Sequence, residues 1–216
     1  MTKRWFTSDL HIQHALVARN RGFVVPGEFE WSEREQDHVP KADCDAHDAA
    51  VAANWDRVVR KDDIVYVAGD IAMNPRKGAF QWLRERPGRK ILIAGNHDEV
   101  AGFHSKGLTE RNKPDWAETF EAISDFAFLK IGGRRVALSH YPYDGEGERD
   151  GEDRMTEVRL RDVGIPLLHG HTHGRHQAHV SSAGTPMFHV GLDAWNLELV
   201  PESTIAEWVQ YLPETR

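Results

Sequence analysis

The stretch Leu167-Leu168-His169-Gly170-His171-Thr172-His173-Gly174 runs from two apolar residues through a glycine to two histidines that are two positions apart. Neutral imidazole is the commonest metal ligand of proteins. A glycine beside such ligands lets the backbone come close to whatever they hold. A single His-x-His pair is more often part of a surface loop than of a metal site, so its meaning depends on the rest of the chain.

Four other stretches share this pattern. Each is a short apolar run, rich in β-branched or aromatic residues, that is typical of a buried strand and ends in Asp, Asn or His. They are residues 5–8 before Asp9-Leu10-His11, 64–68 before Gly69-Asp70, 91–94 before Gly95-Asn96-His97-Asp98, and 136–139 before His140. Ligands of open α/β sheets bind beyond the carboxyl ends of the strands. Five such strand ends therefore indicate one shared metal site rather than scattered turn residues.

These blocks resemble the five signature blocks of the calcineurin-like metallophosphoesterases. They occur in the family's order and span residues 9–173 of the 216. Any one block is common, but the combination is specific. The resemblance implies the α/β class and a four-layer α/β/β/α sandwich of two mixed sheets flanked by helices. The length suits one domain, so we expect residues 1–216 to form a single metallophosphoesterase domain.

The resemblance also implies a ligand set for two metal ions. The first ion would be held by Asp9, His11, Asp70 and His173, and the second by Asp70, Asn96, His140 and His171. Asp70 would then bridge the two ions. From the residue types alone, nitrogen and oxygen donors without a thiolate suit manganese, iron, zinc or nickel rather than calcium or Cu(I). We expect two divalent transition-metal ions, with manganese favoured.

Two such ions clamp the attacking and leaving oxygens of an in-line displacement, with a hydroxide between them as nucleophile. The predicted function is a dinuclear phosphodiesterase for small phosphodiesters such as 2′,3′-cyclic nucleotides, because segments 8–14 and 189–196 look like those of small phage and bacterial members of the superfamily. The alternatives are a nuclease or phosphomonoesterase on the same metal core, and a catalytically inactive scaffold. The complete ligand set disfavours the scaffold. After Asp70 the chain lacks the acid found there in protein phosphatases, which disfavours a phosphoprotein substrate.

His97 and Asp98 are the predicted catalytic residues. His97 belongs to neither ligand set, and in the family Asp98 orients its ring. A protonated imidazole beside the departing oxygen would act as a general acid. The alternative is a structural histidine that hydrogen-bonds the turn. Asp193 is a further candidate for a supporting role, behind the ligands.

The composition sets the remaining expectations. The 27 Lys and Arg against 34 Asp and Glu give a net charge of -7, which argues against stable nucleic-acid binding and leaves a small phosphodiester or nucleotide as substrate. Bound metal would reverse the local field for such an anion. The single cysteine, Cys44, suits a reducing compartment. No apolar run is long enough for a membrane span, so we expect a cytoplasmic protein; the oligomeric state is left open.

The chain between the blocks predicts helices and two long loops. The helices are expected at residues 12–20, 45–60, 75–86, 156–162 and 202–211, a hairpin at 126–131 and 135–139, and a late strand at 187–190. Residues 21–45 are expected to be an irregular loop, with Arg19 and Arg21 at its start as a possible phosphate clamp or, more commonly, a solvated pair. Residues 143–154 are expected to be a flexible, solvated acidic loop; the alternative is that its negative charge disfavours large polyanions near the site. Which residues of these loops contact substrate is left open.

Overall fold

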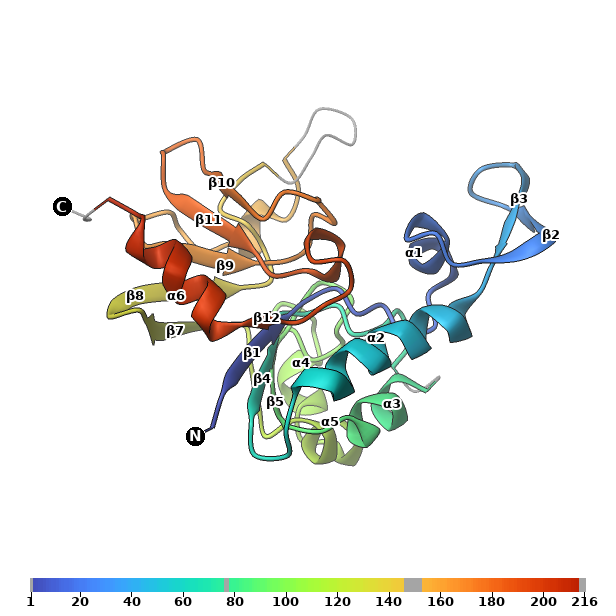
Figure 1. Ribbon diagram of the computed structural model, residues 1–216, viewed down its shortest axis with the longest axis horizontal. Helices are drawn as coiled ribbons and strands as arrows, with labels where there is room; N and C mark the ends of the chain where they lie inside the picture. Colours follow the sequence, from blue (N-terminus) through green and yellow to red (C-terminus); the bar gives the residue numbers. More distant parts are fainter. Residues whose placement is uncertain (1, 76–77, 146–152, 214–216) are drawn as a thin grey trace.

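Figure 1 shows the computed structural model of the protein, which describes residues 2–75, 78–145 and 153–213. Two five-stranded sheets form its centre. The first has the order β12 (Val200–Pro201), β1 (Arg4–Thr7), β4 (Ile64–Val67), β5 (Arg89–Ile93) and β6 (Ala122–Ser124). The second has the order β10 (Ala178–Val180), β11 (Pro186–His189), β9 (Leu167–His169), β8 (Arg134–Ser139) and β7 (Phe126–Ile131).

Both sheets are mixed. In the first, β1, β4, β5 and β6 are parallel and β12 is antiparallel to β1. In the second, β11, β9 and β8 are parallel, and antiparallel strands form both edges. Helices flank this pair of sheets, so the predicted fold class is confirmed. Because the parallel strands run the same way, their carboxyl ends meet at one edge of each sheet.

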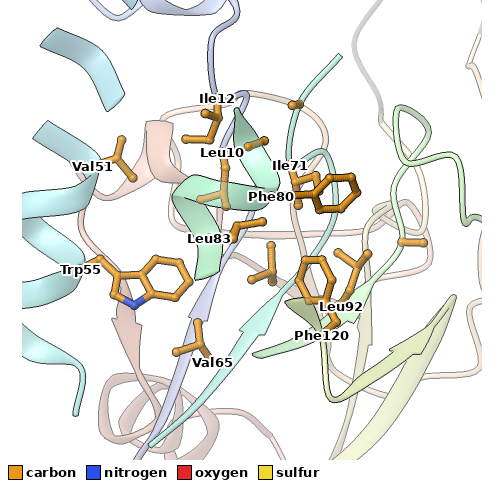
Figure 2. Close-up of a cluster of buried hydrophobic side chains, with 14 of the residues drawn as sticks. Leu10, Ile12, Val51, Trp55, Val65, Ile71, Phe80, Leu83, Leu92 and Phe120 are labelled. Atoms are coloured by element: carbon orange, nitrogen blue, oxygen red, sulfur yellow. The ribbon is translucent and has the colours of Figure 1, made fainter. Parts of the chain in front are cut away.

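The outer face of the first sheet is covered by α2 (Cys44–Val58), α3 (Ala79–Glu85) and α5 (Pro114–Thr119), whose side chains belong to the same apolar cluster as those of the sheet. Figure 1 shows these helices and the short α4 (Gly107–Glu110) near β1, β4 and β5. Asp43 caps α2, since its side chain accepts a hydrogen bond from the Ala46 N–H at 2.9 Å. Val51 and Trp55 of α2 and Leu83 of α3 pack against Val65 and Leu92 of the sheet (Figure 2). Burial of each such side chain stabilises the fold by about 1.5–3 kcal/mol.

A second apolar cluster lies between the sheets. Phe6 and Ile93 meet Leu138 and Leu168 there, and α6 (Glu202–Gln210) adds its buried Ile205 and Val209. The opposite face of the second sheet is covered more thinly. Tyr143, Leu160 and Ile165 pack there on Ala137, Leu167 and Met187. The 3₁₀ turn η1 (Thr156–Val158) lies shortly before Leu160 in the chain.

Residues 21–45 differ from the expectation of an irregular loop. They contain the antiparallel hairpin of β2 (Val24–Ser32) and β3 (Asp37–Ala42), which follows α1 (Ala15–Asn20) and projects away from both sheets in Figure 1. Both faces of this hairpin are largely exposed. Phe29 and Trp31 alternate with Glu28 and Glu30 along β2, but both apolar side chains are more than half exposed, so this alternation does not mark a face buried in the core.

Other local expectations need smaller corrections. The helix expected at 156–162 is only the single turn η1, and the helix expected at 45–60 is α2, which begins at Cys44 with Asp43 as its cap and ends at Val58. The hairpin at β7 and β8, the strand β11 and the helix α6 are confirmed. Most of the acidic loop at 143–154 lies outside the described residues. Among the described residues, no helix has the length and apolarity to cross a membrane.

Candidate metal centre

The carboxyl ends of five central strands bring the seven predicted ligands together. The donor atoms form two groups, and within each group they all lie within 4.8 Å of one another; the groups are Asp9, His11 and His173, and Asp70, His140 and His171. Asn96 joins the second group, since its Oδ1 lies 3.2 Å from His140 Nε2. Ligands that are far apart in the chain therefore meet at one point, where both sheets end.

Asp70 lies between the two groups. Its Oδ2 is 3.8 Å from His11 Nε2 in the first group and 3.5 Å from His140 Nε2 in the second. The side chain is almost completely buried. Burial alone would favour the neutral acid, but the nearby histidines, His140 first, lower the pKa of Asp70 far below its usual range. A carboxylate that is ionised and equidistant from both groups is suited to bridging two cations.

Five of the seven predicted ligands have left-handed backbone conformations. The φ angles are 58° at Asp9, 47° at His11, 55° at Asp70, 71° at His171 and 52° at His173. Each non-glycine residue in this region costs on the order of 1–3 kcal/mol, and such residues cluster at functional sites. Here the unusual backbone turns each side chain toward the shared centre directly after its strand.

Two glycines allow the close approach of the ligand loops. A Cβ atom on Gly170 would lie 1.9 Å from Ser8 Oγ and 2.6 Å from Asp9 Oδ2. A Cβ on Gly95 would lie 2.3 Å from Asp70 Oδ1. Any larger residue at either position would displace an aspartate of the centre, which accounts for the glycines in the Gly-His and Gly-Asn blocks.

The histidines are held so that one ring nitrogen of each faces the centre. His140 Nδ1 donates to the Ala68 carbonyl at 2.7 Å, and His173 Nδ1 donates to Asp193 Oδ2 at 2.9 Å. Donation from Nδ1 leaves Nε2 as a neutral lone pair, which is the form that binds metal. His11 Nε2 is buried without a hydrogen-bond partner among the described residues. This donor set fits divalent transition-metal ions.

Asp193 connects the first ligand group to a buried arginine. Arg21 Nε and Nη2 donate to its two carboxylate oxygens at 3.0 and 2.7 Å, and Nη2 also donates to the Asp9 carbonyl at 2.8 Å. Arg19 is ion-paired with Glu35 at 3.0 Å. Both side chains are largely buried and ion-paired within the protein, so the structure supports neither the solvated pair that the sequence favoured nor the alternative of a phosphate clamp.

Asp98 and His97 have separate roles in the structure. The buried Asp98 carboxylate accepts backbone N–H groups from Asp70 at 2.9 Å, Gly95 at 2.8 Å and Ile71 at 3.2 Å, so it holds the turn rather than the His97 ring. This corrects the expectation that Asp98 orients His97. Burial and the Asp70 carboxylate raise the pKa of Asp98 to about 7, against the effect of its N–H donors. The His97 side chain is 36% exposed, and its Nε2 lies 3.9 Å from Asp70 Oδ2.

Two clefts open from the centre. One, of about 620 Å³, is lined by His11, His97 and His173 and by three arginines, Arg34, Arg154 and Arg175; we call it the arginine cleft. The other, of about 600 Å³, is lined by Asn96, His97, His104, Lys106 and Lys113; we call it the lysine cleft. His97 lines both. Sequence patterns did not single out Arg34 or Arg175, because neither lies in a signature block.

Comparison with known proteins agrees with this geometry. The chain is 37% identical to the gene 66 proteins of Mycobacterium phages D29 and L5, over 99% of its own length in both cases and 99% and 97% of theirs. A protein of unknown function from Aquifex aeolicus shares the fold, with a TM-score of 0.62 at 22% identity over 96% of this chain and all of that one. The profile of the calcineurin-like phosphoesterases matches residues 2–175, which include all the predicted ligands. The chain therefore belongs to the calcineurin-like phosphoesterase family and is a metal-dependent phosphoesterase.

Proposed function

We propose that the protein is a phosphodiesterase that hydrolyses small phosphodiesters, with cyclic nucleotides among its substrates. One observation carries this proposal: the arginine cleft and the lysine cleft meet at His97. A phosphorus atom beside the two ligand groups would therefore have open space on both sides. A linear diester carries a separate substituent on each of two ester oxygens and would use both clefts, whereas a monoester needs only one. Cyclic nucleotides, whose two ester oxygens belong to one ribose, are proposed from the likeness of segments 8–14 and 189–196 to those of small members of the family.

The proposed metal sites use the seven predicted ligands. Asp9, His11, Asp70 and His173 would hold one ion, and Asp70, Asn96, His140 and His171 the other. Two divalent cations, with manganese our first choice and iron, zinc or nickel the others, would supply Lewis-acid polarisation of the phosphoryl oxygens and lower the pKa of water. The chain itself orients the rings, through the Ala68 carbonyl and the Asp193 carboxylate.

We assign proton transfer to His97. It lies outside both ligand groups, and its Nε2 is close to Asp70 without a hydrogen bond to it, at 3.9 Å. Its backbone N–H donates to Asp70 Oδ1 at 3.0 Å, which fixes the residue beside the centre. Its ring contacts the His11 ring edge-on and makes no hydrogen bond within the described residues. A proton passed from Nε2 to the departing ester oxygen would contribute about 10²–10⁴-fold. Because His97 lines both clefts, it has access to a leaving group in either.

The setting of the reaction follows from the charge and the single cysteine. We propose a cytoplasmic enzyme that consists of one domain, residues 1–216, since both sheets supply ligands to the same centre. The net charge of -7 supports a small nucleotide-like substrate rather than stable binding to a nucleic acid.

A substrate panel tests the proposal. The manganese-loaded protein would be assayed with 2′,3′-cyclic and 3′,5′-cyclic nucleotides, bis-p-nitrophenyl phosphate and p-nitrophenyl phosphate. We expect a higher kcat/KM for the diester of p-nitrophenol than for its monoester, and about two metal ions per chain. A higher kcat/KM for the monoester would refute the diester assignment. A protein that binds no metal after reconstitution would be a scaffold.

A further inference from the structure

We propose that Arg34 and Arg175 form a second anion site in the arginine cleft, and that the preferred substrate is a phosphodiester bearing an additional phosphate group that is bound there and not hydrolysed. This inference rests on the proposed function for the reacting group. It identifies the substrate more narrowly, as a nucleotide-like diester with a terminal phosphate.

The first argument for this anion site is the positive charge of the arginine cleft. Among the residues that the structure describes, Arg34, Arg154, Arg175 and one acid, Asp193, line it. Both oxygens of Asp193 already accept hydrogen bonds from Arg21, and one also accepts from His173, so this carboxylate does not neutralise the arginines of the cleft. The whole chain carries a net charge of -7, so the positive charge of these arginines is opposite in sign to that of the chain as a whole. A cleft with this local charge attracts anions.

Arg34 is positioned over the cleft by its neighbour. It lies in the turn between β2 and β3, and the adjacent Glu35 accepts a hydrogen bond from Arg19 Nη2 at 3.0 Å. Arg19 belongs to α1, whose Leu16 and Val17 also line the cleft. The ion pair thus anchors the hairpin tip to the wall of the cleft. The guanidinium of Arg34 itself has no hydrogen bond or ion pair with any residue in the described ranges.

Arg175 provides a second guanidinium group, close to the metal centre. It follows the ligand His173 by two positions, so their Cα atoms are at most about 7.6 Å apart. Its guanidinium likewise makes no hydrogen bond or ion pair within the part of the chain that the structure describes. Guanidinium groups bind phosphate oxygens bidentately, which makes a free pair beside the reacting centre suited to a second phosphate of the same small molecule.

A matched pair of substrates isolates this site. Thymidine 5′-(p-nitrophenyl phosphate) and its 3′-phosphorylated form share the nucleoside and the leaving group and differ by one phosphate. We expect the manganese enzyme to show a kcat/KM about tenfold higher for the 3′-phosphorylated form, since one charge-assisted pair contributes about that factor. Arg34→Gln and Arg175→Gln should each lower this ratio, and the double variant should bring it to about one.

Arg57→Gln provides the control. Arg57 is an exposed arginine of α2 that pairs with Glu198, so its loss changes the net charge equally without touching the arginine cleft. The substrate ratio of this variant should equal that of the unaltered enzyme. A ratio at or below one in the unaltered enzyme, or a preference that persists in the double variant, would overturn the second anion site.

A binding measurement separates this inference from the proposed function. Calorimetry of the manganese-loaded protein would compare thymidine 3′,5′-bisphosphate with thymidine 5′-monophosphate. Tighter binding of the bisphosphate that the double variant abolishes supports the second anion site even if neither diester is cleaved, in which case the phosphodiesterase assignment fails. Cleavage of both diesters with equal binding of the two nucleotides leaves the phosphodiesterase assignment standing and refutes the second anion site.

Discussion

Replacing Asp193 with alanine should weaken the fold and the metal centre together. The Arg21 and Asp193 side chains are only 5% and 15% exposed, so the change leaves a buried guanidinium without its carboxylate. Breaking such a pair costs about 3–5 kcal/mol. Arg21 keeps the carbonyl of Asp9 at 2.8 Å and a ring nitrogen of His47 at 3.0 Å, so we expect the lower end, about 3 kcal/mol. His173 also loses the acceptor that fixes its ring, and loss of such a partner lowers metal affinity about 10–100-fold.

Two assays separate these effects. Urea unfolding of the metal-free protein gives the loss of stability without the contribution of ligand binding. Competition with a chelator gives the metal affinity. Asp193→Asn, which keeps one acceptor oxygen, should give smaller losses in both. Glu198→Ala removes an exposed partner of Arg57 and should cost less than about 1 kcal/mol with unchanged affinity. Unaltered metal affinity in a destabilised Asp193→Ala protein would refute the orienting role and leave Asp193 a purely structural residue.

Substitutions of Asp70, His97 and Asp63 give three further predictions. Asp70→Ala should abolish turnover and lower the metal content of a protein whose circular dichroism is unchanged; two retained metals with near-normal turnover would place the bridge elsewhere. His97→Ala should keep its metals and lose far more rate on a cyclic nucleotide than on a p-nitrophenyl diester, because an alkoxide needs a proton on departure and p-nitrophenolate hardly does; equal losses would indicate phosphate positioning. Burial opposes ionisation of Asp63, but N–H donors that include Lys3 and Trp5 lower its pKa. Asp63→Asn should therefore cost about 1–2 kcal/mol at pH 7, by urea unfolding. This difference in stability is fully present above a pH of about 3.9, the pKa of an Asp in the unfolded chain, and should shrink as the pH falls through the lower pKa of Asp63 in the folded protein. A stability difference that grows in acid would contradict this role of Asp63.

The metal centre was predictable because its ligands follow strands that the sequence shows clearly. The runs before Asp9, Asp70 and Asn96 are largely buried, and those before Asp70 and Asn96 are continuously apolar. Parallel strands bring their carboxyl ends to one edge, so residues far apart in the chain were expected to meet. Strand positions alone do not predict that His173 joins Asp9 and His11 while His171 joins Asp70 and His140. That assignment came from the resemblance to the family.

The walls of the clefts were not predictable in the same way. Arg34 reaches the arginine cleft only because β2 and β3 form a hairpin and Arg19 holds its tip. The apolar side chains of β2, Phe29 and Trp31, are exposed rather than buried in the core, and the deciding ion pair joins positions 16 residues apart. The short strands β6, β10 and β12 escaped notice for another reason. With three, three and two residues, each is shorter than any periodic pattern that a sequence can display.

The role of Asp98 shows why a motif position can be recognised correctly and still be interpreted wrongly. The left-handed backbone at Asp70 is strained, and its N–H, like that of Gly95, points to the buried Asp98 carboxylate. One buried acceptor thus holds the loops after β4 and β5 together. The loop after β1 is braced in turn, since the His11 N–H donates to the Asp70 carbonyl at 3.1 Å. We therefore expect Asp98 to influence the reaction through the position of Asp70, because the strained ligand loop needs the buried acid to hold it.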